Sequence, residues 1–177
     1  QLMMTYQKLF SEYQYTAAQV LLTFDVISDD NRRLNAVNTF NELLQLGVVP
    51  IVNENDTVAT EEIEFGDNDT LSAIVSSLIH ADLLILMSDI DGLYTDDPRR
   101  NPDAKLIPLV TEINDELKSM AKGAVTSLGT GGMATKIAAA SIATDSGADM
   151  VILNGEKVSI LNHLMQGDDV GTIFLAH

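Results

Sequence analysis

Three segments of this chain have residue types and spacings that suit chemistry on a small molecule. Two of them, residues 53–56 and 66–69, combine amide and acid side chains that can bind both the ammonium and the carboxylate of a zwitterion. The third, residues 129–136, places glycines and then a lysine at the expected start of a helix, an arrangement that suits phosphate. Together they indicate phosphoryl transfer to a small metabolite.

The glycine-rich segment offers both a backbone and a side-chain contact for phosphate. Gly131 and Gly132 leave backbone N–H groups accessible, and the positive end of the helix dipole favours an anion. Lys136 lies one turn inside that helix, where its ammonium can oppose the negative charge that accumulates during phosphoryl transfer. The spacing is not that of a Walker loop, and glycines before a helix are also common in ordinary loops.

The first amide-and-acid segment follows a short apolar run, residues 48–52, that predicts a buried strand. Open α/β sheets bind ligands at the carboxyl ends of their strands, so this location favours a binding role. Asp56 is suited to pair with a substrate ammonium, and Asn68 offers both donors and an acceptor. Aspartate and asparagine also make turns and cap helices, and Asp69 is a candidate N-cap of the next helix.

Apolar runs alternate with helical patterns along the chain, and this alternation must position the three segments. We expect strands over residues 19–24, 48–52, 83–88, 150–153 and 172–175, and helices over residues 31–46, 69–81, 114–121, 133–146 and 160–165. Strands separated by helices predict an α/β fold, a three-layer αβα sandwich with a mainly parallel central sheet. The chain opens on a helical pattern with no strand before it, so we expect the N-terminal portion of the fold to be missing.

Composition restricts the class of partner. The 177 residues are 46% hydrophobic and 20% charged, enough to close one core, and a net charge of -16 disfavours binding to nucleic acid or to an anionic membrane. The absence of cysteine is compatible with a reducing compartment, and no apolar run is long enough to cross a bilayer. We therefore expect one cytoplasmic domain that binds neither nucleic acid nor membrane.

The three segments resemble those of the glutamate 5-kinases, which are members of the amino-acid kinase family. The resemblance covers the whole chain and is most specific in the sequence PIVNEND at residues 50–56 and GDND at residues 66–69. The sequence GLYT at residues 92–95, with Asp-Pro at residues 97–98, is shared more widely in the family. The resemblance implies the amino-acid kinase fold and ATP-dependent phosphorylation of the γ-carboxylate of L-glutamate, the first step of proline biosynthesis.

The resemblance also implies roles for individual residues. The glutamate site would comprise Asp56, Asn68, Asn53, Asp67 and Asp69. The nucleotide site would comprise Ser88, Asp89, Thr130, Gly131, Gly132, Met133, Ala134, Thr135 and Lys136. Lys136 would be the catalytic group, ATP and Mg²⁺ the cofactors, and the metal ligands stay unassigned. The substrate carboxylate is already ionised at neutral pH, so the reaction needs no general base.

At the level of the whole protein, the resemblance implies feedback inhibition by L-proline and a homo-oligomer. The family's opening strand with its lysine and phosphate loop is absent from residues 1–177, as is the PUA domain that follows the kinase domain in many members. We therefore assign residues 1–177 to the C-terminal, larger part of an amino-acid kinase domain. Two alternatives stay open. One is a sister kinase acting on aspartate, N-acetylglutamate or a nucleoside monophosphate, and the other is a non-catalytic module that binds an amino acid or a nucleotide.

Overall fold

The structure is a computed structural model that describes residues 1–23, 25–55, 67–96, 98, 100–123 and 132–177. The chain divides into two compact units, residues 1–71 and residues 72–177, and each is described by itself. No helix in the described part of the chain is long and apolar enough to cross a membrane.

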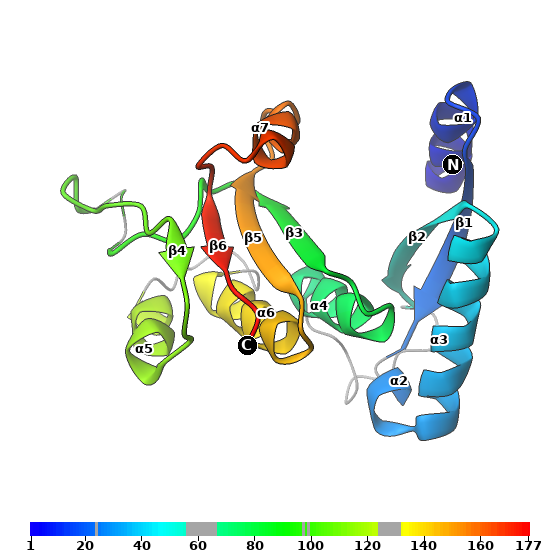
Figure 1. Ribbon diagram of the computed structural model, residues 1–177, viewed down its shortest axis with the longest axis horizontal. Helices are drawn as coiled ribbons and strands as arrows, with labels where there is room; N and C mark the ends of the chain where they lie inside the picture. Colours follow the sequence, from blue (N-terminus) through cyan, green and yellow to red (C-terminus); the bar gives the residue numbers. More distant parts are fainter. Residues whose placement is uncertain (24, 56–66, 97, 99, 124–131) are drawn as a thin grey trace. The chain divides into compact units, whose positions relative to one another are not determined.

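The first unit is a pair of parallel strands with helices before and between them. It contains, in chain order, α1 (Leu2–Glu12), β1 (Thr16–Leu22), α2 (Asp25–Ser28), α3 (Asp30–Gln45) and β2 (Val48–Glu54). β1 and β2 pair in register from Thr16 opposite Val48 to Leu22 opposite Glu54. Figure 1 shows α3 running alongside the two strands, and its Phe40 side chain is fully buried. The strands therefore end side by side, at one edge of this small sheet.

Local sequence explains where α3 begins and ends. Asp29 is its N-cap, because one carboxylate oxygen accepts hydrogen bonds from the backbone N–H groups of Asn31 and Arg32, at 2.9 and 3.0 Å. Just past the helix, Gly47 has a φ of 69°, a left-handed conformation that glycine adopts without steric cost. The chain then turns directly into β2.

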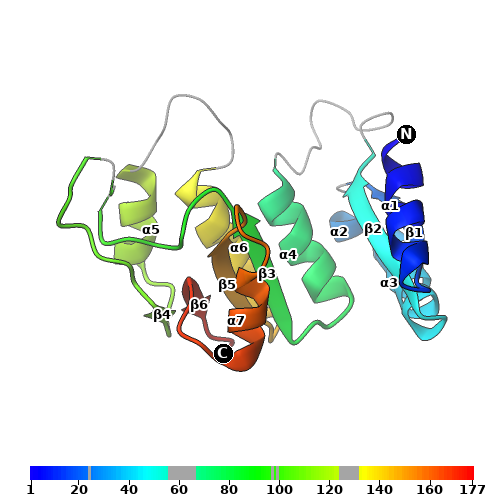
Figure 2. The same cartoon turned by 90° about the horizontal axis from the view of Figure 1, so that it is seen from above.

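The second unit is built on a four-stranded sheet. Its elements are α4 (Asn68–Leu78), which begins just before the boundary between the units, β3 (Leu83–Ser88), β4 (Leu109–Val110), α5 (Asp115–Gly123), α6 (Met133–Asp145), β5 (Asp149–Asn154), α7 (Ile160–Gln166) and β6 (Thr172–Phe174). The strand order is β3-β5-β6-β4, with β3/β5 and β4/β6 parallel and β5/β6 antiparallel. Figure 2 shows α4 and α6 on one side of this sheet and α7 on the other, so the unit has three layers.

The core of the second unit lies between α6 and the sheet. Alanines at 139, 140 and 143 of α6 are fully buried, and they face a cluster that includes Met150 and Ile152 of β5 and Phe174 of β6. Because alanine is small, it lets the helix backbone approach the strands closely. Each large apolar side chain buried here contributes about 1.5–3 kcal/mol relative to exposure.

Hydrogen bonds of Thr172 join the long connection after β3 to β6, and two glycines allow close packing beside it. The Thr172 hydroxyl is buried, accepts a hydrogen bond from the Leu93 backbone N–H at 2.8 Å and donates one to the Ile107 carbonyl at 2.7 Å. A Cβ atom on Gly92 would lie 2.5 Å from the Thr172 hydroxyl oxygen, and one on Gly171 would lie 2.1 Å from the Ile152 carbonyl oxygen. A side chain at position 92 would therefore displace the Thr172 hydroxyl, and one at position 171 would collide with the backbone of β5.

Most of the expected elements are present, with differences in bounds, in two short elements and in one helix cap. The strand expected over residues 48–52 continues to Glu54, and the one expected over residues 19–24 spans Thr16–Leu22. Two short elements, α2 and β4, were not predicted, because four and two residues are too few for a periodic pattern. The N-cap of α4 is Asp67, so the prediction of Asp69 was wrong.

Candidate active site

The carboxyl ends of β1 and β2 form one edge of the first unit, where the sequence predicted part of a ligand site. The backbone N–H of Asn55 donates to the Leu22 carbonyl at 2.7 Å, so the strands stay paired just past β2. Asn53 is exposed, and its side-chain oxygen accepts from the Glu54 backbone N–H at 3.0 Å. Asn53 thus lies within β2 near its end, while Asp56 lies outside the described residues.

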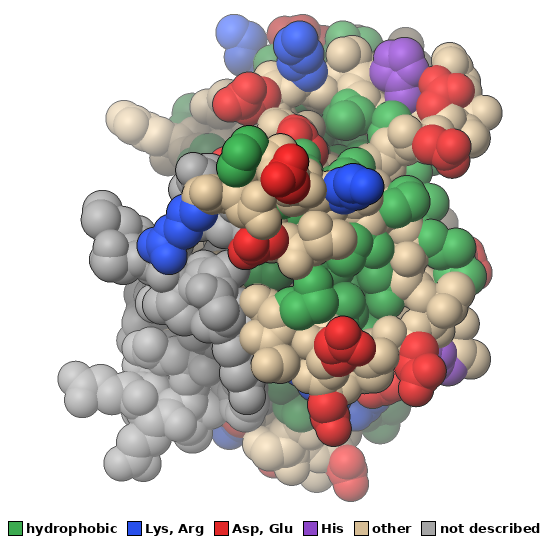
Figure 3. All heavy atoms as spheres, turned by 90° about the vertical axis from the view of Figure 1, so that its left-hand side faces the viewer, with side chains coloured by type: hydrophobic (Ala, Val, Ile, Leu, Met, Phe, Trp, Pro, Cys, Tyr) green, Lys and Arg blue, Asp and Glu red, His purple; other side chains and the backbone are tan. Residues whose placement is uncertain are grey.

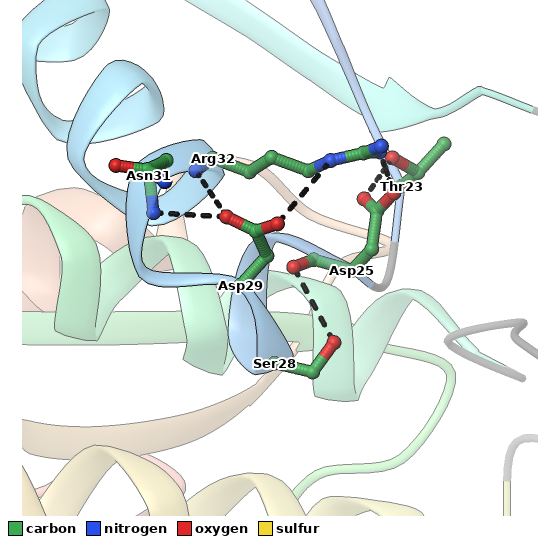
Figure 4. Close-up of polar contacts among 6 residues, drawn as sticks. All are labelled: Thr23, Asp25, Ser28, Asp29, Asn31 and Arg32. Atoms are coloured by element: carbon green, nitrogen blue, oxygen red, sulfur yellow. Dashed lines mark hydrogen bonds and ion pairs between the residues drawn. The ribbon is translucent and has the colours of Figure 1, made fainter.

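A group of polar side chains that the sequence analysis did not single out follows β1 (Figure 4). Asp25 pairs with the Arg32 guanidinium and accepts a hydrogen bond from the Thr23 hydroxyl. The Arg32 Nε atom lies 3.9 Å from a carboxylate oxygen of Asp29, the N-cap of α3. The Arg32 side chain is 60% exposed, so these ion pairs add little stability. They link the connection after β1 to the first turn of α3.

Sequence patterning had no means of finding this group. A cap at Asp29 or Asp30 is what an aspartate pair before a helical pattern predicts, and the structure selects Asp29. The partners Asp25 and Arg32 are seven residues apart, and the pairing depends on the short helix α2 that folds the chain between them.

The start of α4 carries the second predicted group of glutamate-binding residues. Asp67 accepts from the Thr70 backbone N–H at 2.7 Å with one carboxylate oxygen, and from the Thr70 hydroxyl at 3.0 Å with the other. Asn68 is exposed and Asp69 is half-buried in the first turn, where a carboxylate complements the helix dipole. Both Asp67 oxygens therefore hold the helix start, and Asn68 is the member most accessible to a ligand.

The predicted nucleotide residues Ser88 and Asp89 lie at the carboxyl end of β3. The Ser88 hydroxyl donates to an Asp89 carboxylate oxygen at 3.2 Å. The Ser88 carbonyl accepts from the Gly155 backbone N–H at 2.7 Å, which joins the end of β3 to the turn that follows β5. Asp89 is exposed and Ser88 is half-buried, so both are within reach of a ligand at this edge.

The same edge carries a side-chain network that the sequence analysis also missed. Asn154, the last residue of β5, donates from its amide to one carboxylate oxygen of Asp91 at 2.8 Å. The Tyr94 hydroxyl donates to the other carboxylate oxygen at 3.1 Å. We call Asp91, Tyr94 and Asn154 the edge network. Burial raises the pKa of Tyr94, and the hydrogen bond to Asp91 and the negative charge of Asp91 raise it further.

The start of α6 holds the described part of the predicted phosphate segment. Gly132 is the N-cap and has no side chain with which to cap the helix, while the Thr135 hydroxyl and backbone N–H both bond to the Gly132 carbonyl, at 2.7 and 3.1 Å. Met133 and Ala134 form the first turn. Lys136 is only 6% exposed, so its charge acts in a surrounding of low dielectric constant. Thr130 and Gly131 lie outside the described residues.

The lengths of α6 and β5 place the start of α6 at the edge that carries Ser88 and Asp89. The 13 residues of α6 and the 6 residues of β5 both extend over about 20 Å. The helix packs against the strand and is joined to it by a short turn at residues 146–148. The chain therefore reverses, and α6 begins at the level where β5 and β3 end. The backbone N–H groups at the start of α6 are therefore at the same edge as Ser88 and Asp89, and a helix N-terminus of this kind suits a phosphate.

No group of three or more histidine, aspartate or glutamate side chains that could hold a metal ion occurs among the described residues. Figure 3 shows the face of the second unit that carries β4 and α5, where acidic side chains lie above and below an area of hydrophobic ones. The acidic surface agrees with the net charge of -16 for the whole sequence.

Comparison with known proteins identifies the family. The model of the Amino acid kinase family matches residues 1–154. The chain belongs to the amino acid kinase family. The fold predicted from the sequence, with its resemblance to this family, is thereby confirmed.

Within this family, relatives with high sequence identity to the chain are glutamate 5-kinases. The glutamate 5-kinase of Carboxydothermus hydrogenoformans is 57% identical over 173 residues, which are 98% of this chain and 46% of that protein. The glutamate 5-kinase of Clostridium acetobutylicum is 55% identical over 174 residues, 98% of this chain and 65% of that protein. The chain thus spans about half to two thirds of the length of these relatives. The resemblance to glutamate 5-kinases is confirmed.

Solved structures support the fold alone. An isopentenyl phosphate kinase of T. acidophilum superposes with a TM-score of 0.64 at 17% identity, covering 98% of this chain and 65% of that one. A UMP kinase of Bacillus anthracis superposes with a TM-score of 0.63 at 19% identity, covering 94% of this chain and 61% of that one. These enzymes act on different substrates, so the shared fold does not by itself select an acceptor.

Proposed function

We propose that the protein containing this chain is a glutamate 5-kinase, which transfers the γ-phosphoryl group of ATP to the γ-carboxylate of L-glutamate at the start of proline biosynthesis. The observation that carries the proposal is the 51–57% identity to several glutamate 5-kinases over nearly the whole chain. The described residues at the ends of β2 and β3 and at the starts of α4 and α6 are chemically suited to this reaction. They offer amides and carboxylates for an amino acid and a helix start for phosphate.

The nucleotide would bind at the carboxyl edge of the second unit. Its phosphates would meet the first turn of α6, where the dipole and the backbone N–H groups favour an anion. Ser88 and Asp89 would contact the nucleotide from the end of β3, and Lys136 would contact the transferring phosphoryl group from inside α6. Thr130 and Gly131 would complete the segment that covers the nucleotide.

Magnesium would accompany ATP. Mg²⁺ prefers oxygen ligands and is commonly held by one or two carboxylates together with substrate phosphates. The exposed carboxylate of Asp89 at the end of β3 is a donor of this type and fits the role. When bound, the ion supplies charge neutralisation between the phosphates and the incoming carboxylate.

Glutamate would be bound by residues that follow β2 and begin α4. Asp56 would pair with the substrate ammonium, and Asn53 and Asn68 would donate to its carboxylate oxygens. Asp67 would act indirectly, because both of its oxygens hold the helix on which Asn68 and Asp69 lie. The γ-carboxylate attacks phosphorus in its ionised form, so catalysis would rest on in-line positioning and on neutralising the repulsion between two anions.

Trapping of the product tests this proposal. The protein is expressed from its native start and incubated with ATP, Mg²⁺ and hydroxylamine, which converts an acyl phosphate into a hydroxamate that is detected as its coloured ferric complex. L-Glutamate, L-aspartate and N-acetyl-L-glutamate are compared as acceptors. We expect hydroxamate with L-glutamate alone. Product with another acceptor would assign a sister kinase, and no product from folded protein that binds ATP would indicate a binding module.

Regulation and assembly follow from the same resemblance. We propose that L-proline inhibits the enzyme, that the protein forms a homo-oligomer and that it works in the cytoplasm. Inhibition of hydroxamate formation by L-proline, and the mass measured by light scattering, would test the first two statements.

A further inference from the structure

The edge network joins two segments that are far apart in the sequence. Asp91 and Tyr94, three residues apart, belong to the connection after β3, and Asn154 is at the end of β5, 63 residues beyond Asp91. The contacts among them lie immediately beside Ser88 and Asp89. Asn154 therefore contacts the segment that follows a different strand, β3.

Two bonds, one from the last residue of β5 and one from the residue after it, reach residues 88 and 91. The Asn154 amide holds the Asp91 side chain at 2.8 Å, and the Gly155 backbone N–H holds the Ser88 carbonyl at 2.7 Å. The turn also packs tightly, because a Cβ atom on Gly155 would lie 3.3 Å from the Met87 Cβ atom. Residues 88 and 91, the two ends of the segment that contains Asp89, are thus bonded to the adjacent residues Gly155 and Asn154.

We propose that the edge network is a positioning device for nucleotide binding, which acts by fixing the backbone of residues 88–91. The inference rests on the proposed function, since it takes Ser88 and Asp89 as nucleotide contacts. Asp91 and Asn154 act through these residues and need not touch the substrate. Asp91 is exposed, and an exposed hydrogen bond adds little to the stability of a fold, so the network has its main effect on geometry.

An exchange of the two partners tests the positioning role. Asn154→Asp places two carboxylates where an amide and a carboxylate are now 2.8 Å apart, and their repulsion opens the turn. The double variant Asp91→Asn with Asn154→Asp restores an amide–carboxylate pair with the partners reversed and keeps the native net charge. The equilibrium dissociation constant for ATP with Mg²⁺ is measured without glutamate, and the KM values for ATP and glutamate are measured separately.

We expect Asn154→Asp to weaken ATP binding about tenfold, the free energy of about one charge-assisted hydrogen bond. The KM for glutamate should stay within about twofold, and the double variant should recover most of the ATP affinity, as a coupled pair requires. Asn162→Asp is the matched control, because it adds the same charge at an exposed position on α7 outside the network. It should leave the affinity for ATP unchanged.

Three results would overturn the inference: an unchanged ATP affinity in Asn154→Asp, a double variant as weak as the single one, or an equal loss of affinity in Asn162→Asp. A lowered melting temperature with native ATP affinity would also overturn it, as it would show a purely structural role. If the native protein binds ATP but yields no glutamyl hydroxamate, the proposed function fails while the ATP affinities still decide this inference.

Discussion

Lys136 is the residue on which the proposed catalysis depends most. Its side chain is 6% exposed and lies on the buried face of α6, so an alanine would remove packing as well as charge. Lys136→Met keeps most of the side-chain volume and removes the ammonium. We expect kcat to fall about 100-fold or more, with little change in the KM for glutamate, because the charge acts mainly in the transition state. Steady-state kinetics measure both constants.

The control for this variant is Lys118→Met, on an exposed position of α5. It should retain native kcat. A native kcat in Lys136→Met, with its fold verified by circular dichroism, would remove Lys136 from the reaction.

Asp56 is the proposed partner of the substrate ammonium. Removing one member of a charge-assisted pair costs about 1.5–3 kcal/mol, so Asp56→Ala should raise the KM for glutamate at least tenfold. The KM for ATP should change little. Initial rates over a range of each substrate separate the two constants, and a defect confined to ATP would contradict the assignment.

The raised pKa of Tyr94, a member of the edge network, predicts how the stability of the protein changes at high pH. Burial, the hydrogen bond to Asp91 and the charge of Asp91 raise its pKa in the folded protein above the ordinary value of 10.0. The unfolded chain therefore loses this proton first, so the stability that Tyr94 contributes is complete below about pH 10 and is lost as the pH rises towards the folded pKa. Tyr94→Phe should show a smaller loss of stability over this range.

Urea unfolding at several pH values above 9 measures this difference, and tyrosinate absorbance measures the titration directly. The spectrum of the native protein minus that of Tyr94→Phe should titrate with a midpoint above pH 10. A midpoint at or below 10 would contradict the raised pKa that burial and Asp91 together give Tyr94.

At the scale of the elements, a single side chain caps the start of α4. Asp67 caps the helix with bonds to the Thr70 backbone N–H and hydroxyl. Asp67→Ala should lower the free energy of unfolding by about 1 kcal/mol. Asp67→Ser keeps an oxygen acceptor at the cap and should lose clearly less.

Urea denaturation measures these changes, and Asp169→Ala, at an exposed position after α7, is the control. Equal losses in the alanine and serine variants of Asp67 would show that capping is not the source of the stability. If Asp67 acts by positioning Asn68, the alanine variant should also raise the KM for glutamate.

Sequence patterns located the longer elements well. The helix expected over residues 31–46 is Asp30–Gln45, and the strand expected over residues 83–88 is Leu83–Ser88. Both have long or strongly apolar patterns, together with a cap or a turn residue at an end. The Asp91–Asn154 bond had no such signal, because it joins residues 63 positions apart whose types are common in turns. Contacts of this kind depend on strand order, which periodicity does not report.

For the molecule as a whole, the net charge has the same sign as the charge of the proposed ligands. The sequence has a net charge of -16, and both ATP and glutamate are anions. At physiological salt this long-range repulsion is screened over about 8 Å, so binding depends on groups close to the ligand. In the proposed function, the first turn of α6 and the Lys136 ammonium would supply this local attraction.

The central claim is that a carboxylate oxygen of glutamate attacks the γ-phosphorus of ATP, and oxygen tracing tests it most directly. L-Glutamate labelled with ¹⁸O in its γ-carboxylate is incubated with the protein expressed from its native start, together with ATP, Mg²⁺ and hydroxylamine. Hydroxylamine attacks the acyl carbon and releases phosphate, which keeps the oxygen that bridged carbon and phosphorus. We predict phosphate that contains one ¹⁸O atom, in an amount equal to the hydroxamate formed. Unlabelled phosphate with no hydroxamate would show that ATP is hydrolysed by water and would contradict the assignment.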